Sequence, residues 1–242
     1  MVVYSKSVCR EAFVGIYLIP IPFIIVLIIY YKIYREKNDL KKVGIIQTLI
    51  TCLDVVVCIL SYLTPGFSLS YTLLVLLGLG LAIVADLNFV EHNDYNMKNL
   101  TVTLVMFLFI YMSYSAAITL KHGFLIEDLY FVPSLLLIVV LSLAYLWKGL
   151  NGLRIPILIY LLILCFFLSR SISTFFGSGF AVAQSIMLTA AASMFFIGDL
   201  ELAIGSFKRP LPRYIRVDYI GPVTYALAQT LMALSTCYFP HS

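Results

Sequence analysis

The chain has little charge for its length. Asp, Glu, Lys and Arg make up 12% of its 242 residues, about half the share of about 25% that is usual in soluble domains. Apolar and aromatic residues reach 62%, and the mean hydropathy is +1.02. A water-soluble globule of this size cannot bury so much apolar surface. The composition therefore excludes a soluble enzyme, a nucleic-acid-binding protein and a disordered protein, and it predicts an integral membrane protein built from helices.

Histidine and cysteine are scarce where a metal site would need them. The three histidines, His92, His122 and His241, fall in predicted loops or in the tail, so no predicted span carries a His or Cys/His cluster with metal spacing. The five cysteines imply no disulfide framework. The sequence also has no Gly-x-Ser-x-Gly segment and no phosphate-binding glycine loop. We therefore expect no metal and no cofactor.

Eight apolar stretches are long enough to cross a membrane as helices, which takes roughly 20 residues. Turn-forming segments separate several of them, including Thr64-Pro65-Gly66, Lys121-His122-Gly123 and Asn151-Gly152. Every loop is short, so we predict an all-α fold with a single membrane domain over residues 1–242. The predicted spans are residues 13–31, 43–63, 70–89, 99–119, 130–147, 154–172, 180–205 and 217–237.

The distribution of Lys and Arg predicts the orientation of the chain. With eight spans, the odd-numbered loops carry 12 of the 16 Lys and Arg residues, and the termini together with the even-numbered loops carry 4. Loops rich in Lys and Arg stay in the cytoplasm. The odd-numbered loops are therefore predicted to be cytoplasmic and both termini to lie outside.

Four acidic residues lie inside predicted spans: Asp54, Asp86, Asp199 and Glu201. A charged residue at the centre of a spanning helix costs on the order of 2.5–3.5 kcal/mol on insertion scales, so such a residue usually faces a polar cavity and has a function. Glu201 is nearest the cytoplasmic end and can equally reach the headgroups. Asp86 and Asp199 are the stronger candidates for a functional site.

Asp86 and Asp199 occupy similar segments, Ile83–Asn88 and Phe196–Glu201. The third and seventh spans run in the same direction, and both aspartates lie roughly 5–10 Å inside the cytoplasmic boundary at about 1.5 Å per residue. We predict a parallel repeat of four plus four helices, related by an axis along the membrane normal. In such a repeat the two carboxyls would face each other across a central cleft.

Further polar residues lie at a similar depth. Tyr225 and Gln229 are four residues apart, on one face of the eighth span. Tyr111 and Tyr114 are three apart on the fourth span, and Lys42 stands at the cytoplasmic start of the second. An amide at mid-membrane needs a hydrogen-bonding partner. We take Tyr225, Gln229, Tyr111 and Lys42 as candidate substrate-binding residues.

The C-terminal third resembles the YhhN family, the transmembrane lysoplasmalogenases. The family pattern there is roughly Phe-x-Ser-Asp-x-x-Leu-Ala, an aromatic residue, Pro-x-Pro, and Thr-Tyr-x-x-Ala-Gln. The matching residues are Phe196, Asp199, Leu202, Ala203, Phe207, Pro210, Pro212, Thr224, Tyr225, Ala228 and Gln229. Gly198 stands in place of the usual Ser, and Ala85-Asp86 stands where the family has Gly-Asp. The fourth span usually reads Phe-x-x-Ala-His-x-x-Tyr, and Tyr111 takes the place of the His.

The resemblance implies hydrolysis of the vinyl ether bond of a lysoplasmalogen, a lysophospholipid, to a fatty aldehyde and a glycerophospho-ethanolamine or -choline. Protonation of the β-carbon opens a vinyl ether through an oxocarbenium ion, and this step needs a positioned acid. A second carboxylate can stabilise the cation or orient water. We expect Asp86 and Asp199 to be the catalytic pair, in roles that the sequence leaves open.

Two other functions fit the same features. A small-solute or proton-coupled transporter also combines parallel repeats with carboxylates inside the membrane, although no matched pair of broken helices is apparent. A non-catalytic lipid-binding protein is the other, because the His of the family is missing. Membrane lipids are the partners expected in every case, and nucleic acid is not.

Overall fold

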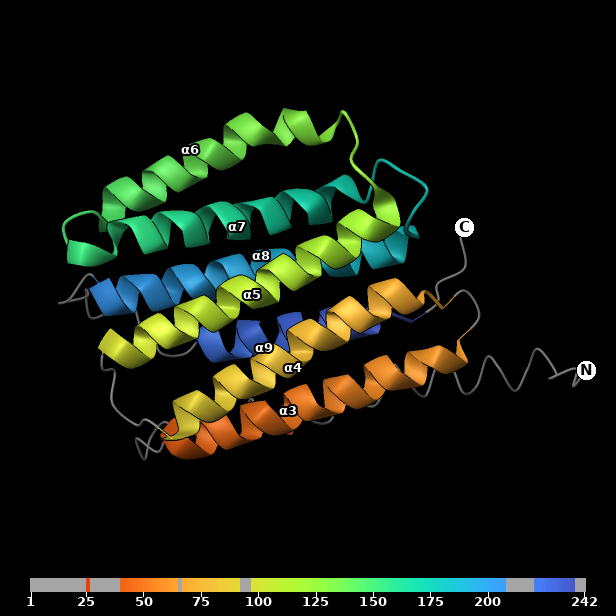
Figure 1. Cartoon of the computed structure of the whole chain (residues 1–242), viewed down its shortest axis with the longest axis horizontal. Coiled ribbons are helices and arrows are strands. Elements are labelled where there is room, and N and C mark those ends of the chain that lie inside the picture. Colours follow the sequence, from red (N-terminus) through yellow and green to blue (C-terminus); the bar gives the residue numbers. More distant parts are fainter. Residues whose placement is uncertain (1–24, 27–39, 65–66, 92–96, 208–219, 238–242) are drawn as a thin grey trace, which may run out of the picture.

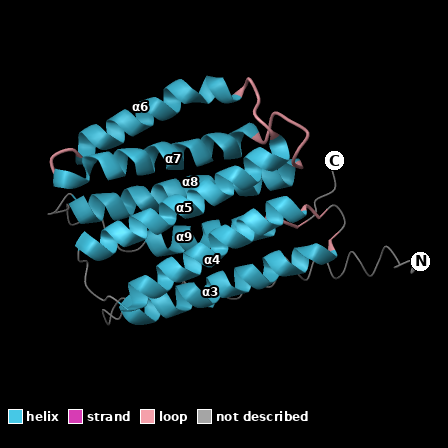
Figure 2. Ribbon diagram, viewed as in Figure 1, coloured by secondary structure: helices cyan, strands magenta, loops and turns pink. Residues whose placement is uncertain are grey.

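The computed structural model describes residues 25–26, 40–64, 67–91, 97–207 and 220–237, and over these residues it contains helices and no strand (Figures 1 and 2). Consecutive helices run antiparallel to each other (Figure 1). The α-helices are α3 (Leu40–Leu60), α4 (Leu69–Glu91), α5 (Met97–His122), α6 (Asp128–Leu146), α7 (Arg154–Ser173), α8 (Val182–Phe207) and α9 (Ile220–Leu234), and the short 3-10 helices are η1 (Ser61–Leu63) and η2 (Asn151–Leu153).

Six of the described helices, α3 to α8, are long and apolar enough to cross a membrane. Their outward faces carry exposed apolar side chains, such as Leu49, Leu77, Phe109, Leu137 and Ile159. A continuous apolar surface of this kind is stable in lipid and not in water. These helices make the chain an integral membrane protein.

The predicted spans from 43–63 to 180–205 coincide with α3 to α8, with differences of a few residues at the ends. The last one was drawn too long: α9 has 15 residues and ends at Leu234, not at residue 237. The first predicted span, 13–31, lies outside the described residues apart from residues 25–26, so the count of eight spans stays a prediction.

The end of α5 corrects one expectation. His122 was placed in a loop, but it is the last residue of α5, partly buried, with Nε2 3.0 Å from the backbone oxygen of Ser173 on α7. Gly123 follows with φ of 75°. This left-handed conformation ends a helix at little cost only when the residue is glycine, so the Lys121-His122-Gly123 segment does terminate the helix as predicted.

Six helices pack in a closed ring. Neighbours along the ring are α3 and α4, α4 and α5, α5 and α7, α7 and α8, α8 and α9, and finally α9 and α3. Helix α6 packs outside the ring on α7, at the edge of the molecule in Figure 1. The ring encloses the largest cluster of buried side chains, which is rich in aromatic residues and includes Phe107, Tyr111, Phe167, Phe195 and Tyr225.

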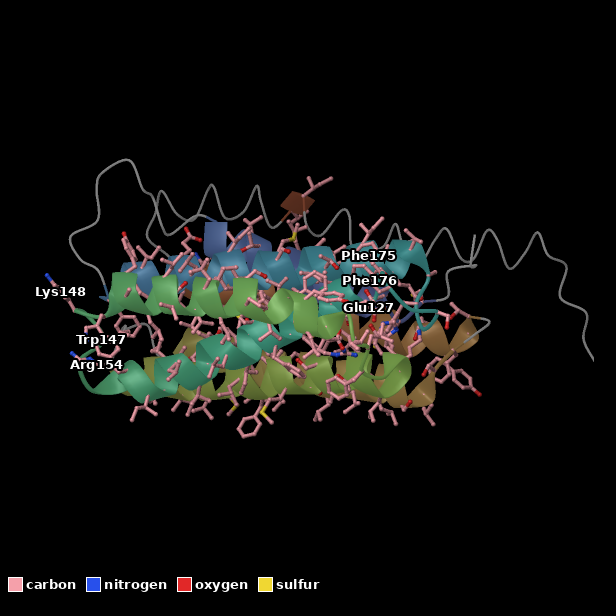
Figure 3. All side chains as sticks on the ribbon, turned by 90° about the horizontal axis from the view of Figure 1, so that it is seen from above. Glu127, Trp147, Lys148, Arg154, Phe175 and Phe176 are labelled. Carbon is pink, nitrogen blue, oxygen red and sulfur yellow. The ribbon has the colours of Figure 1, made fainter. Side chains whose placement is uncertain are left out.

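The two ends of the bundle differ in chemistry (Figure 3). At the end formed by the α6–α7 connection, the Arg154 guanidinium lies 4.4 Å from the centre of the Trp147 ring, and Lys148 is exposed. Aromatic and basic side chains of this kind are enriched where a helix leaves the hydrocarbon. The other end carries Phe175 and Phe176 on the turn after α7.

Arg170 stabilises the end of the bundle that carries Phe175 and Phe176. Its side chain is 1% exposed and hydrogen-bonds to three groups of the α5–α6 region: the Asp128 carboxylate, the Gly123 backbone oxygen and the Thr119 hydroxyl. The guanidinium also lies 4.7 Å from the centre of the Phe124 ring. Because a buried charge is tolerated only when it is paired and hydrogen-bonded, these contacts hold the α5–α6 connection against α7.

Arg170→Met is expected to lower the free energy of unfolding by about 3–5 kcal/mol, because it leaves the Asp128 carboxylate without its partner. Thermal unfolding of the purified protein in detergent measures the loss. Arg154→Met, which removes an exposed arginine from the same helix, is the matched control. Equal midpoints for the two variants would contradict this role of Arg170.

Candidate functional site

Asp199 lies on the inner side of α8 and accepts two short hydrogen bonds. The Tyr111 hydroxyl, from α5, donates to Oδ2 at 2.5 Å, and the Tyr160 hydroxyl, from α7, donates to the same oxygen at 2.6 Å. Both tyrosines are buried. Three helices of the ring thus meet at one carboxyl oxygen. A carboxyl among apolar side chains requires such donors, because the lipid around the ring supplies none.

An apolar pocket reaches this carboxyl. Its walls come from α5, α6, α7 and α8, and Asp199 and Tyr160 are the only two of its lining side chains that carry a polar group. The other lining residues are Leu104, Leu146, Ile157, Leu161, Leu164, Phe196, Leu200, Leu202, Ala203 and Phe207. Leu146 and Phe207 end α6 and α8 respectively, so the pocket runs from Asp199 toward the end of the bundle that carries Trp147 and Arg154. An apolar pocket with a few convergent polar groups is the usual form of a small-molecule site.

Asp86 is held by different partners. It is 4% exposed near the end of α4, and its Oδ2 accepts a hydrogen bond of 3.1 Å from the Thr51 hydroxyl on α3. The carboxyl also interacts with the Tyr225 hydroxyl on α9. Asp86 does not line the pocket that Asp199 lines. Within the described residues, no hydrogen bond joins the two carboxyls, and the central cleft between them stays a prediction.

Tyr225 lies between the two aspartates. Its ring centre is 5.4 Å from that of Phe107 and 5.8 Å from that of Phe195, and Phe195 in turn packs against Tyr111 at 5.2 Å. Its hydroxyl interacts with Asp86 and Gln229. Within the described residues, however, neither contact has the distance and angle of a hydrogen bond. Tyr225 therefore connects the surroundings of Asp86 with the aromatic side chains around Asp199.

A third carboxyl, Asp54, extends the buried polar groups along α3. It is 1% exposed, and its Oδ2 accepts a hydrogen bond of 3.2 Å from the Thr230 hydroxyl on α9. Next to Thr230, the Gln229 amide oxygen accepts a hydrogen bond of 2.5 Å from the Tyr114 hydroxyl. Each helix of the ring thus contributes at least one polar side chain to the interior.

Three of the four predicted substrate-binding residues contact an aspartate or one another. Tyr111 contacts Asp199, and Tyr225 and Gln229 interact with each other on one face of α9, as their spacing predicts. Lys42, the fourth predicted substrate-binding residue, is exposed at the start of α3. Glu201 packs toward α9, where its Oε2 would lie 3.1 Å from a side chain added at Gly221.

Three partners were missed by the sequence reading: Tyr160, Thr51 and Thr230. Each donates its hydroxyl to one of the three aspartates inside the ring. Thr51 had a detectable signal, because it precedes Asp54 by three residues and so shares its helix face. Tyr160 had none, since it is one of 17 tyrosines in a chain where aromatic residues are common.

Gly198 has a packing reason to differ from the Ser that the family pattern has beside Asp199. A Cβ atom at this position would lie 2.7 Å from the Thr224 hydroxyl oxygen on α9. The glycine thus permits α8 and α9 to approach closely next to Asp199, as small residues do between membrane helices.

This arrangement defines a class: a polytopic membrane protein with carboxyl groups inside the helix bundle, one of them at the wall of an apolar pocket. Comparison with protein families identifies the family to which the chain belongs. The chain belongs to the YhhN family, whose model matches residues 46–236. Comparison with curated proteins and with solved structures finds no match.

Gly78→Ala is expected to lower the free energy of unfolding by about 1–3 kcal/mol. An added Cβ would overlap the Tyr114 ring and displace the hydroxyl that binds Gln229. The matched control is Gly80→Ala on the same helix, where nothing lies within 4 Å and alanine stabilises a helix by up to about 1 kcal/mol. Thermal unfolding in detergent compares them, and a Gly78 variant as stable as the Gly80 variant would contradict the assigned packing.

Proposed function

We propose that this protein hydrolyses lysoplasmalogens, cleaving the vinyl ether bond to release a fatty aldehyde and a glycerophospho-ethanolamine or -choline. The observation that carries the proposal is the Asp199 carboxyl, which has two phenol donors and lies in the wall of an apolar pocket. Membership of the YhhN family and the resemblance of the C-terminal segments support the same reaction.

Asp199 is the general acid in this proposal, because it lines the pocket and Asp86 does not. Oδ2 is occupied by the two phenol donors, so Oδ1 carries the proton that moves to the β-carbon of the vinyl ether. The two hydrogen bonds of 2.5 and 2.6 Å then stabilise the carboxylate that remains. Donors that are already in place where charge develops reduce the barrier without reorganisation.

Asp86 completes the reaction as the second carboxylate. Water adds to the oxocarbenium carbon and loses a proton to Asp86, which forms a neutral hemiacetal. The carbon–oxygen bond to glycerol then breaks: a bridging water relays the proton from Asp86, which does not line the pocket, to the ether oxygen, and the hemiacetal hydroxyl returns a proton to Asp199. One water is consumed, aldehyde and alcohol are released, and both carboxyls regain their starting state.

The position of the pocket suits a lysophospholipid. Its lining is apolar over four helices, and it extends toward the end of the bundle that carries Trp147, Lys148 and Arg154. The pocket has a volume of about 20 Å³, which is room for about one water molecule, so a lipid chain enters only when the leucines around it move apart. The phosphate would then stay near the basic side chains. Under the positive-inside rule we expect this end to be cytoplasmic, with both termini outside in an eight-span protein.

The packing order of the ring supports the proposed four-plus-four repeat. In that repeat α3 corresponds to α7, α4 to α8 and α5 to α9. The contact of α4 with α5 then corresponds to that of α8 with α9, and the contact of α5 with α7 to that of α9 with α3. The two aspartates would come from equivalent helices, and α6 would correspond to the predicted first span.

Asp199→Asn is expected to lower the rate of aldehyde release by about 10²–10⁴-fold, because it removes the proton donor and keeps the shape. Purified protein with lysoplasmalogen, followed by mass spectrometry of the lipid products, measures the rate. Glu201→Gln on the same helix is the control and should keep a rate close to that of the wild type. Equal rates for the two variants would overturn the role of Asp199. Wild-type protein that binds the lipid and returns it unchanged would favour a lipid-binding protein, and flux without conversion would favour a transporter.

Replacing Tyr111 tests the phenol donors separately. Tyr111→Phe removes one of the two hydrogen bonds to Asp199 and should reduce kcat by about 10²-fold, in the range measured for a single lost oxyanion donor. Tyr111→His restores the residue of the family pattern and a ring N–H donor, so it should keep more activity than the Phe variant. Steady-state kinetics on both variants measure the difference, and a Phe variant that matches the His variant would contradict the assigned hydrogen bond.

A further inference from the structure

The interior of the ring between α3, α4, α5 and α9 holds several buried polar atoms without hydrogen-bond partners among the described residues. They include Asp54 Oδ1, Gln229 Nε2 and the Tyr225 hydroxyl. Their side chains are more than nine-tenths buried. Because a buried polar group without a partner costs about 1–3 kcal/mol, several of them in one region point to a bound polar ligand.

These atoms belong to one connected group. Thr51 and Asp54 lie three residues apart on α3 and reach Asp86 and Thr230 respectively. Tyr114, which holds the amide oxygen of Gln229, interacts electrostatically with both Asp54 and Asp86. Tyr225 interacts with both Gln229 and Asp86. The Gln229 amide nitrogen, the Tyr225 phenol and the free carboxyl oxygen of Asp54 therefore belong to one group of interacting side chains.

The chemistry of the group identifies the ligand. It offers both donors and acceptors at short range, and it lacks the three or more His, Cys, Asp or Glu side chains that a metal site gathers, as far as the structure describes the chain. A buried water typically makes about three hydrogen bonds to polar groups that otherwise have none. Tyr225 and Gln229 interact without meeting hydrogen-bond geometry, and polar groups in that situation are commonly bridged by water.

We propose that this region, formed by Asp54, Gln229, Tyr225 and Asp86, is a water-binding site inside the membrane. The role of this site in the reaction rests on the proposed function. In that role the site supplies the water that adds to the oxocarbenium carbon, and Asp54 is a positioning residue that keeps this water beside Asp86. The hydrolysis consumes one water in a place where the hydrocarbon provides none. Asp54 touches no part of the pocket and acts through the water alone.

X-ray radiolytic labelling tests the water site without any substrate. Hydroxyl radicals formed from bound water modify neighbouring side chains, so Tyr114 and Tyr225 should be labelled in the intact protein although both are buried. Phe167, which is equally buried and carries no polar atom, is the internal control and should stay unlabelled. Labelling of the two tyrosines that is no faster than that of Phe167 would overturn the water site.

Asp54→Leu and Thr230→Val test the assignment to Asp54. Both remove the anchoring of the water, so the labelling of Tyr225 should be lost, and kcat should fall by about 100-fold with an unchanged KM, because neither residue lines the pocket. Thr230→Val preserves the side-chain shape and carries the test if the Leu variant does not fold. Thr48→Val is the matched control, since the Thr48 hydroxyl bonds the backbone oxygen of Gly44 in its own helix.

The outcomes separate the two proposals. Labelled tyrosines in a protein that shows no vinyl ether hydrolysis would support the water site and overturn the proposed function. Labelled tyrosines with an unchanged kcat in both variants would overturn the supply of water by Asp54. A Thr230 variant that loses stability and changes in both KM and kcat would also contradict it, because that pattern indicates a structural role.

Discussion

The two hydrogen bonds from Tyr111 and Tyr160 to one oxygen of Asp199 are the interaction on which the site depends. Hydrocarbon offers a carboxyl neither water nor counterion, so its partners must come from the protein. The ring of six helices supplies them: α7 lies beside α8, and Tyr111 reaches Asp199 from α5, on the other side of α7 in the ring. The same requirement explains why Asp86 and Asp54 each have a threonine hydroxyl from a neighbouring helix.

The ring gives Asp199 and Asp86 different surroundings. Asp199 has the apolar pocket and two phenol donors, whereas Asp86 interacts with the hydroxyls of Thr51 and Tyr225. A reaction that moves a proton to carbon and then adds water benefits from this division, because the two steps need different surroundings: an apolar one for the alkenyl chain and a polar one for the water. Tyr225 lies where the two meet.

The sequence predicts most of the helices and the two aspartates, because length, hydropathy and intramembrane charge are local properties. It predicts the pairing of Tyr225 with Gln229 through their spacing on one face. Partners on other helices, such as Tyr160, leave no local trace. The facing of the two carboxyls across one cleft stays a prediction, because depth in the membrane does not determine the angle around the ring. The replacement of the family's His by Tyr111 suggested a lost site, but the hydroxyl donates to Asp199.

The most direct test of the central claim is an experimental structure of the protein with a lysophospholipid whose chain is attached by a saturated ether, which cannot be cleaved in this way. The account predicts the chain among the leucines between α6, α7 and α8, with the carbon that corresponds to the vinyl β-carbon in contact with Oδ1 of Asp199. A lipid bound only on the outer surface of the ring, with Asp199 still enclosed by its two tyrosines and touching no ligand, would contradict it.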